Sequence, residues 1–594
     1  MEKIVPQTHI VRFGQFELDL RAGDLRKEGV RIRLQEQPFQ VLAMLLERPN
    51  QVVAREEIQS KLWPADTFVD FDHSLNRAIN KLREALGDSA DQPRFIETLA
   101  KRGYRFIASL EDTVREAHKF RGPIDSIAVL PLEIQSTDSD TEYLAVGIPG
   151  SVIHSLSQIP DLRVISWRTT SSEGKLQKDA LAIGRELGVR AVLVGRIWQR
   201  GNKLRLHMDL LDPASGDEIW GDQYDRDLAE LFAVQDDISR AVSQKLRLKL
   251  TGEAKTRLAK RYTENVEAYQ LYVRARRWCE RRSEEGFRRG LEYLSSAIQI
   301  DPNYALAHAE LAQCITTTCY LGVADPKVAY PKAGAAATRA LQIDPNLAEG
   351  HEVLGAILKN YEWNWQAGET EYKLAIELNP NYATAHYRYS YLLAESGRFE
   401  EAIREATEAL SRDPMSGLLN AGLAWVLVNA RRYDRCIEQA LTALDVDPNM
   451  IVAYWALGTA YEQKGKYEAA IDAYEKGNAL GSPAAFGKAL LAYVRAKTGE
   501  SNQAWDTIRD LEHLSRIGFV PATASVIVYD GLAERELAIE ALERAYLNRE
   551  TNLVQIKSWP QFDAVRDDPR FQEIERRVGC ADEGRAYFPV SFPE

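Results

Sequence analysis

Short β-like runs alternate with turn signals at the start of the chain. The runs fall at residues 11–13, 16–20, 25–27 and 30–34, and Glu28-Gly29 provides a turn between the last two. Apolar residues with helical periodicity follow from Pro38 to about Leu86, and a hairpin pattern closes the region near Ala108. This order predicts a small α+β domain over residues 8–108.

The next part of the chain changes to strand–helix alternation. Residues 109–125 are charged and contain Gly-Pro near their end, so we interpret them as a linker. Over residues 126–250 we expect strands at 126–134, 162–166, 191–199, 203–212 and 218–224. Helices are expected at 142–159, at 179–187 and from about Leu231 onward. Such an order is typical of an α/β domain.

The remainder, residues 263–580, is helical and has an internal period. Prolines that end helices occur at positions 302, 345, 380, 414, 448 and 483, so the gaps are 43, 35, 34, 34 and 35 residues. A period near 34 is typical of the tetratricopeptide repeat, a two-helix unit that stacks into a superhelix. In the repeat at 449–482, Gly458 and Ala470 are small where the two helices approach. We expect about eight units, with less regular ones at both ends.

One helical segment in the first domain has two distinct faces. In residues 72–86, Leu75, Ile79, Leu82 and Leu86 recur with a phase that defines one buried face. Short polar and basic side chains elsewhere on such a helix suit insertion into the DNA major groove, where Arg pairs with a guanine edge. The candidate DNA-binding residues of this segment are His73, Ser74, Arg77, Asn80, Lys81 and Arg83.

A basic hairpin follows this helix. Residues 95–108 are predicted to form two short strands around Lys101-Arg102-Gly103, with Arg105 behind the tip. We expect Lys101, Arg102 and Arg105 to grip phosphates or the minor groove of flanking DNA. An amphipathic basic helix alone is weak evidence, because a solvated helix face has the same pattern; the combination with the basic hairpin favours DNA binding.

The distribution of charge supports the same location. The chain of 594 residues has a net charge of −12, yet residues 1–108 carry 17 Lys and Arg against 16 Asp and Glu. Residues 73–105 hold seven basic side chains against four acidic ones. Any nucleic-acid surface is therefore expected in the N-terminal part, and the acidic remainder is expected to avoid DNA.

Several other classes of protein find little support in the sequence. The N-terminus lacks the pattern of a signal peptide, and the longest apolar runs, at 41–46 and 127–132, are too short to cross a membrane, so we expect a cytoplasmic chain. The five cysteines have no metal-ligand spacing, and we predict neither a metal nor a cofactor. No catalytic constellation appears, so an enzyme is not expected.

Residues 11–108 resemble the OmpR/PhoB-type winged helix of bacterial response regulators and of ToxR- and CadC-like activators. The resemblance rests on RLQEQPFQVLAMLLERPNQVVAREEIQSKLW, VDFDHSLNRAINKLREALGD and PRFIETLAKRGYRF. It implies a recognition helix at 72–86, a wing at 95–106, and a loop from Pro64 to Phe71 that contacts RNA polymerase. The chain departs from those families because no receiver domain precedes residue 8 and no membrane segment follows the winged helix.

Residues 126–250 resemble the TolB-N-terminal-like α/β module that precedes tetratricopeptide repeats in bacterial regulators and cyclases. The segments SIAVLPL, LRVISWRTTS and AVLVGRIWQRGNKLRLHMDLLDPASGDEIWGDQYD carry this resemblance, which implies no particular chemistry. The repeats themselves offer a concave surface that suits an extended peptide or a partner helix.

Two hypotheses from different classes remain. In the first, the chain is a one-component transcriptional regulator: the winged helix reads double-stranded DNA, in tandem copies of a homodimer, and the repeats bind a protein partner or mediate oligomerisation. In the second, the chain is a non-enzymatic scaffold whose winged helix binds protein. The basic helix face together with the basic hairpin tip favours the regulator.

Overall fold

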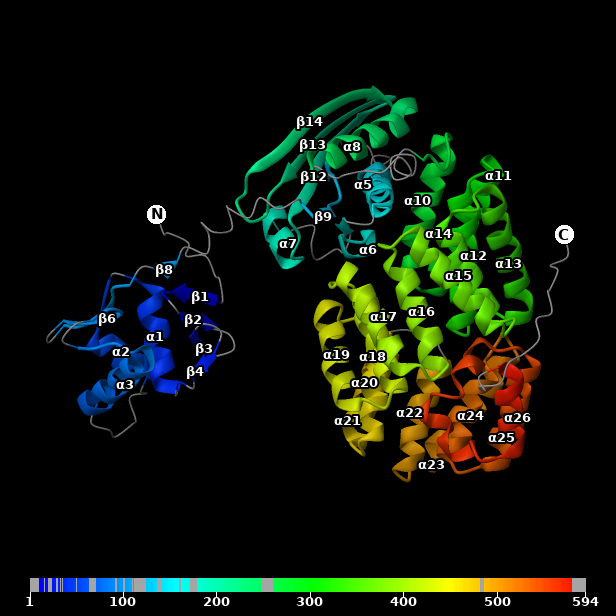
Figure 1. The fold of residues 1–594 in the computed structure, drawn as a ribbon. Coiled ribbons are helices and arrows are strands. Elements are labelled where there is room, and N and C mark those ends of the chain that lie inside the picture. The colour runs from blue at the N-terminus through cyan, green and yellow to red at the C-terminus, as the bar shows by residue number, and fades with distance from the viewer. Residues whose placement is uncertain are drawn as a thin grey trace. The chain divides into compact units, whose positions relative to one another are not determined.

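The computed structural model describes residues 10–14, 16–19, 24–27, 30–32, 34, 36–49, 51–62, 71–90, 93–99, 102–108, 110–111, 124–135, 142–159, 162–170, 179–246, 260–480 and 485–579. Contacts divide the chain into two compact units, residues 1–122 and residues 123–594. We call them the N-terminal unit and the C-terminal unit and describe each by itself (Figure 1).

The N-terminal unit contains two antiparallel sheets. The first has the strand order β4-β3-β2-β1-β8 and the second the order β5-β7-β6. Their strands are β1 (Ile10–Phe13), β2 (Phe16–Asp19), β3 (Asp24–Lys27), β4 (Val30–Ile32), β5 (Val52–Ala54), β6 (Ile96–Leu99), β7 (Gly103–Phe106) and β8 (Leu110–Glu111). The early strands and the hairpin agree with the sequence-based prediction, whereas β5 interrupts a stretch expected to be helical.

Three helices complete the N-terminal unit: α1 (Glu36–Glu47), α2 (Arg55–Leu62) and α3 (Phe71–Leu86). Helix α3 buries Leu75, Ile79, Leu82 and Leu86, as its periodicity predicts. These side chains join a core that also contains aromatic residues of both sheets. The expected α+β winged helix is therefore confirmed, with α3 followed by the β6–β7 wing.

The C-terminal unit begins with a six-stranded sheet whose main order is β11-β9-β12-β13-β14, with β10 beside β12. The strands are β9 (Ser126–Val129), β10 (Glu133–Ile134), β11 (Arg163–Val164), β12 (Ala191–Arg200), β13 (Lys203–Leu211) and β14 (Glu218–Asp227). Helices α5 (Glu142–Ser157) and α8 (Leu231–Lys245) pack on one face, and α7 (Ala180–Glu186) packs on the other. The predicted α/β domain is confirmed; the short helices α6 (Trp167–Thr170) and η2 (Leu228–Glu230) were not expected.

Eight helix pairs follow within the described residues, as the repeat period predicts. They are α10 (Val266–Glu280) with α11 (Glu284–Ile300), α12 (Ala305–Tyr320) with α13 (Pro326–Ile343), α14 (Ala348–Asn360) with α15 (Trp365–Leu378), α16 (Ala383–Glu395) with α17 (Phe399–Arg412), α18 (Gly417–Asn429) with α19 (Tyr433–Val446), α20 (Ile451–Gln463) with α21 (Tyr467–Ala479), α22 (Ala485–Lys497) with α23 (Ser501–Ser515), and α24 (Ala522–Gly531) with α25 (Arg535–Leu547). A Cβ on Gly458 would lie 2.4 Å from the Tyr474 ring, so only glycine lets these paired helices meet.

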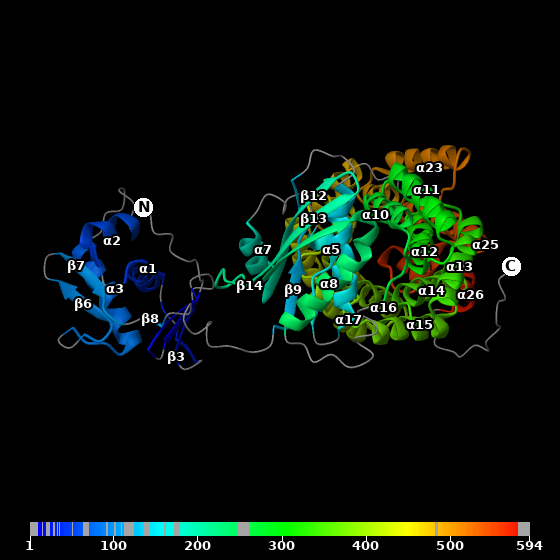
Figure 2. The same ribbon diagram turned by 90° about the horizontal axis from the view of Figure 1, so that it is seen from above.

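Residues 549–579 pack on first helices of several of these pairs instead of continuing the repeat. Two 3-10 helices, η3 (Thr551–Gln555) and η4 (Pro560–Val565), and then α26 (Pro569–Val578) follow the last pair. Trp559 stacks on Trp425 of α18, with ring centroids 5.8 Å apart, and Gln561 donates to Glu462 of α20 at 3.3 Å. We call residues 549–579 the closing segment; Figures 1 and 2 show it in red against the green helices α12–α16.

The closing segment explains why α18 is buried all round. Every residue of α18 is buried, although a helix lining an open groove would expose one face. At α18 the expected open concave surface for a partner is therefore filled, because the chain's own apolar side chains occupy it. These side chains are Leu553, Val554, Ile556, Trp559, Phe562 and Val565.

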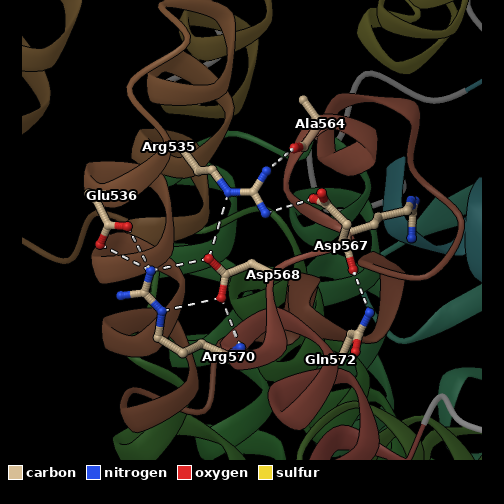
Figure 3. A network of polar contacts seen from close by, with 8 residues as sticks. Arg535, Glu536, Ala564, Asp567, Asp568, Arg570 and Gln572 are labelled. Atoms are coloured by element: carbon tan, nitrogen blue, oxygen red, sulfur yellow. Dashed lines mark hydrogen bonds and ion pairs between the residues drawn. The ribbon is translucent and has the colours of Figure 1, made fainter.

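A network of ion pairs fastens the closing segment to the last repeat (Figure 3). Arg535 of α25 pairs with Asp567 at 2.7 Å and donates to the Ala564 carbonyl at 3.3 Å. Arg570 pairs with Glu536 at 3.0 Å and with Asp568, whose carboxylate also caps the start of α26. Because the charged groups other than Asp568 are exposed, the network orients the segment more than it stabilises it.

The α/β domain docks on the turns between repeats. The side-chain amide of Asn381 donates to the carbonyls of Ser157 and Ile159 at 3.1 and 2.9 Å. Ser166 and Thr169 both donate to the carboxylate of Asp413. The Asn-Pro and Asp-Pro turns that mark the repeat period thus also hold the α/β domain. None of the helices in the described ranges is long and apolar enough to cross a membrane.

Candidate nucleic-acid interface

The solvent-facing side of α3 carries polar and basic side chains. Asn76, Arg77, Asn80 and Glu84 are exposed, and Lys81 is partly exposed. Their positions follow from the helical phase, because the apolar residues between them point into the core. This face has the size and chemistry of a helix that enters a major groove.

The remaining predicted DNA-binding residues differ in exposure, and some lie outside the described residues. Ser74 is partly exposed near the start of the helix. The backbone of His73 lies in α3, but its side chain falls outside the described residues, as do Lys101 and most of the loop at 64–71. Arg102, at the tip of the wing, is exposed.

Arg83 lies inside the domain rather than on the exposed face of α3. Only 7% of its surface is exposed, and its Nη2 donates to the Ile96 carbonyl at 2.9 Å and to the Thr98 hydroxyl at 2.8 Å. Both acceptors belong to β6, the first strand of the wing. The side chain therefore joins α3 to the wing, and its guanidinium is committed to protein acceptors.

Arg105 is likewise engaged by a neighbour. Its guanidinium forms a two-point contact with Glu97 across the wing, at 2.8 and 2.5 Å. About a third of each side chain is exposed, so the pair is partly solvated. Arg105 thus stabilises the β6–β7 pairing through Glu97.

Gly103, which the hairpin pattern places in the turn of the wing, is the first residue of β7. A Cβ at this position would lie 2.0 Å from the Val53 carbonyl oxygen of β5, and φ is 150°. Since only glycine permits this approach, Gly103 lets β7 pair closely with β5. The wing is consequently held by β5 as well as by α3.

A polar triad that sequence reasoning missed links α2, α3 and the wing. Arg55 donates to the Tyr104 hydroxyl and to Oδ1 of Asn76, and Tyr104 donates to the same Asn76 oxygen, each at 3.0 Å. The three residues are 21 to 49 positions apart, so no local pattern connects them. Their contacts set the angle between the exposed face of α3 and the wing.

Asp88 makes the connection from α3 to the wing rigid. Its carboxylate accepts hydrogen bonds from the backbone N–H groups of Arg94, Phe95 and Ile96, at 2.7, 3.2 and 2.8 Å. Three donors on one ionised side chain satisfy backbone groups that would otherwise lack partners. The start of β6 is therefore fixed relative to the end of α3.

Comparison with protein-family models defines the class. Residues 29–106 match the family "Transcriptional regulatory protein, C terminal", and residues 371–404 and 422–485 match tetratricopeptide-repeat families. The chain thus has the architecture of a transcriptional regulator, with an OmpR/PhoB-type winged helix followed by tetratricopeptide repeats.

Three relatives illustrate how these parts are combined elsewhere. The transcriptional regulator HilA of Salmonella typhimurium is 22% identical over 415 residues, 70% of this chain and 72% of that protein. The cholera toxin transcriptional activator of Vibrio cholerae is 40% identical over 85 residues, 14% of this chain and 29% of its own. A putative adenylate cyclase 3 of Rhizobium meliloti is 35% identical over 187 residues, and this match spans only 32% of either chain.

Proposed function

We propose that the chain is a DNA-binding transcriptional regulator whose α3 reads base edges in the major groove. The observation that carries the proposal is the row of exposed polar side chains on α3, next to a wing fixed by Arg83, Asp88 and the Arg55–Asn76–Tyr104 triad. A rigid helix and wing orient the contacts before DNA arrives, which lowers the entropic cost of binding.

Within this interface, Arg77 is proposed to pair with a guanine, and Ser74, Asn80 and Lys81 to contact bases or phosphates. His73 and Lys101, whose side chains lie outside the described residues, stay in the proposal on the sequence pattern alone. Arg102 at the exposed wing tip is proposed to contact phosphate. We leave Arg83 out of the contact set and assign it, together with Arg105, to holding the wing.

Different parts of the chain are proposed to bind different partners. The loop at 64–71 is proposed to meet RNA polymerase, and two copies of the chain are proposed to bind adjacent half-sites. A protein partner of the repeats would use the outer surface, because the closing segment covers the inner one. A regulator that reads a bacterial chromosome works in the cytoplasm.

The test is binding of the purified full-length chain to labelled genomic fragments, including its own upstream region, at low salt. We expect binding that weakens as salt rises, with a shallower salt dependence for Arg102→Ala. Arg240→Ala, which removes an exposed cation of α8, is the matched control and should leave binding unchanged. No binding to any fragment at low salt would exclude the regulator and favour the scaffold hypothesis.

A further inference from the structure

A cavity of about 480 Å³ lies inside the C-terminal unit, between the α/β domain and the first repeats. Helices α5 and α8 and the segment before β10 form one wall, and residues 260–263 with α10 and the start of α12 form the other. A volume of this size is typical of sites that bind small organic molecules. We call it the junction cavity.

Apolar and aromatic side chains form much of its lining. Leu132, Phe232, Tyr262, Val273 and Leu306 contribute to the wall, and Tyr269 is anchored there by hydrogen bonds with Ser151 at 2.7 Å and Gln235 at 3.1 Å. Burial raises the pKa of Tyr269 to about 12, although both hydrogen bonds act in the opposite direction. The cavity is therefore shaped by neutral, fixed groups that suit the body of an organic molecule.

The charged part of the lining is predominantly basic. Five cations, Lys260, Arg261, Arg276, Arg277 and Arg281, face two carboxylates, Asp236 and Glu280. Some of these cations already have partners: Arg261 pairs with Asp236 at 2.6 Å, and Lys260 pairs with Asp344 at 2.5 Å. The excess of positive charge favours an anionic occupant.

Arg276 differs from those paired cations. Among the described residues no hydrogen bond or ion pair holds its guanidinium, which lies 5.8 Å from the Tyr272 ring centre. Burial by itself would lower the pKa of Arg276, but the fields of Tyr272 and Glu310 more than offset it, so the group stays charged. A guanidinium with five N–H donors in a lined cavity is the group that recognises an oxyanion in two places.

We propose that the junction cavity binds a small organic oxyanion with an apolar body, and that Arg276 pairs with its acidic group. The occupant would contact both the α/β domain and the first repeats, since the walls of the junction cavity come from both. This inference does not depend on DNA binding, and its test uses no DNA.

Gly150 of α5 provides a way to fill the cavity without disturbing its walls. It lines the cavity, and a Cβ built on it would meet no atom within 4 Å. The Cβ of a leucine at this position therefore meets no atom, its longer side chain would occupy part of the cavity, and replacing a helical glycine does not weaken the helix. Arg288→Gln, at an exposed arginine of α11, is the matched control for Arg276→Gln.

The experiment titrates the full-length chain with anilinonaphthalenesulfonate, a fluorescent oxyanion with an aromatic body, and with phenylnaphthylamine, its uncharged counterpart. We expect saturable binding of one sulfonate probe per chain, weakened about tenfold or more by Arg276→Gln and unchanged by Arg288→Gln. The neutral probe should not distinguish Arg276→Gln from the parent chain, and Gly150→Leu should abolish binding of both probes.

Other outcomes overturn the proposal. Equal sulfonate binding by the parent chain, Arg276→Gln and Gly150→Leu would show that the probe binds elsewhere. An equal loss of both probes in Arg276→Gln would remove the assignment of the anion to this side chain. Far-ultraviolet circular dichroism on each variant shows that it is folded, and Gly150→Leu tests the cavity independently if Arg276→Gln does not fold.

Discussion

The hydroxyl of Tyr104 in the wing lies 3.0 Å from Oδ1 of Asn76 in α3 and donates to it. Arg55 of α2 donates to both atoms, so three elements share one small polar cluster. In the proposed DNA complex the helix and the wing meet DNA at different places, so their relative angle would decide whether both can bind at once. Under the proposed function, the cluster would act on DNA binding by fixing this angle rather than by direct contact.

Removing the Tyr104 hydroxyl should loosen the wing without unfolding the domain. Tyr104→Phe removes two hydrogen bonds, the one accepted from Arg55 and the one donated to Asn76, so we expect it to cost about 1–3 kcal/mol of local stability. Hydrogen exchange of the β6 and β7 amides should become faster. Tyr467→Phe, at an exposed tyrosine of α21, is the control and should leave these amides unchanged; unchanged exchange in Tyr104→Phe would show that the cluster does not restrain the wing.

Arg77 is the residue expected to determine sequence preference. We predict that Arg77→Ala costs about 1–3 kcal/mol on the preferred site and narrows the difference between preferred and random DNA. Glu84 lies two turns further along the same exposed face, so Glu84→Ala is the matched control and should not weaken binding. Competition binding with both DNAs measures the effect; an equal loss on all sequences would assign Arg77 to phosphate instead.

Arg83 is predicted to act on stability first. Arg83→Met keeps the aliphatic stem but removes the donors to Ile96 and Thr98, so we expect a loss of about 1.5–3 kcal/mol. In the absence of DNA, the amides of β6 and β7 should exchange hydrogen faster in Arg83→Met than in the parent chain. Arg77→Ala should leave their exchange rates unchanged. A variant that loses DNA affinity with unaltered wing exchange would contradict this assignment and return Arg83 to the DNA-contact set.

The closing segment should contribute heavily to the stability of the repeats. Trp559 is 4% exposed and packs between Trp425, Phe486 and Phe562, so Trp559→Ala is expected to cost about 3–5 kcal/mol. Urea unfolding followed by circular dichroism measures this cost. Trp505 is only partly buried, and Trp505→Ala should cost clearly less; equal costs would mean that the segment does not cover the inner surface tightly.

Much of this architecture could be predicted because periodicity reports burial. The phase of Leu75, Ile79, Leu82 and Leu86 identified the buried face of α3, and the proline period identified the repeats. The same reasoning misplaced Arg83, since a pattern method treats every arginine as a surface residue. It also missed β5, because three residues are too short for a period to appear.

Contacts between residues far apart in the sequence explain the remaining differences between the sequence-based prediction and the structure. Asn76 gains its role only when Arg55 and Tyr104 are brought to it, and nothing near it in sequence indicates this. The sequence predicts less regular terminal repeats where the closing segment lies, because the apolar residues of this segment have no 34-residue period to mark them as a separate element. Its contacts with α18 and α20 join residues about a hundred or more positions apart, which only the curvature of the array brings together.

His351 provides a pH-dependent contact inside the repeats. Its Nδ1 lies 2.6 Å from the Glu371 carboxylate and its Nε2 lies 2.9 Å from the Pro345 carbonyl. Burial would lower the pKa of His351, but these two acceptors outweigh burial, so the pKa lies above its ordinary value of 6.5. Protonation of this histidine therefore stabilises the folded chain.

The stabilising contribution of His351 should be fully present below pH 6.5, the pKa expected for the unfolded chain, and should be lost as pH rises through the folded pKa. Asn420 occupies the equivalent position two repeats later and donates to the Pro414 carbonyl at 3.0 Å. His351→Asn should thus keep the turn contact while removing the titration. Urea unfolding of both proteins from about pH 5 to about pH 8 should show a stability difference that shrinks toward high pH; a difference independent of pH would mean that the His351–Glu371 pair does not depend on protonation.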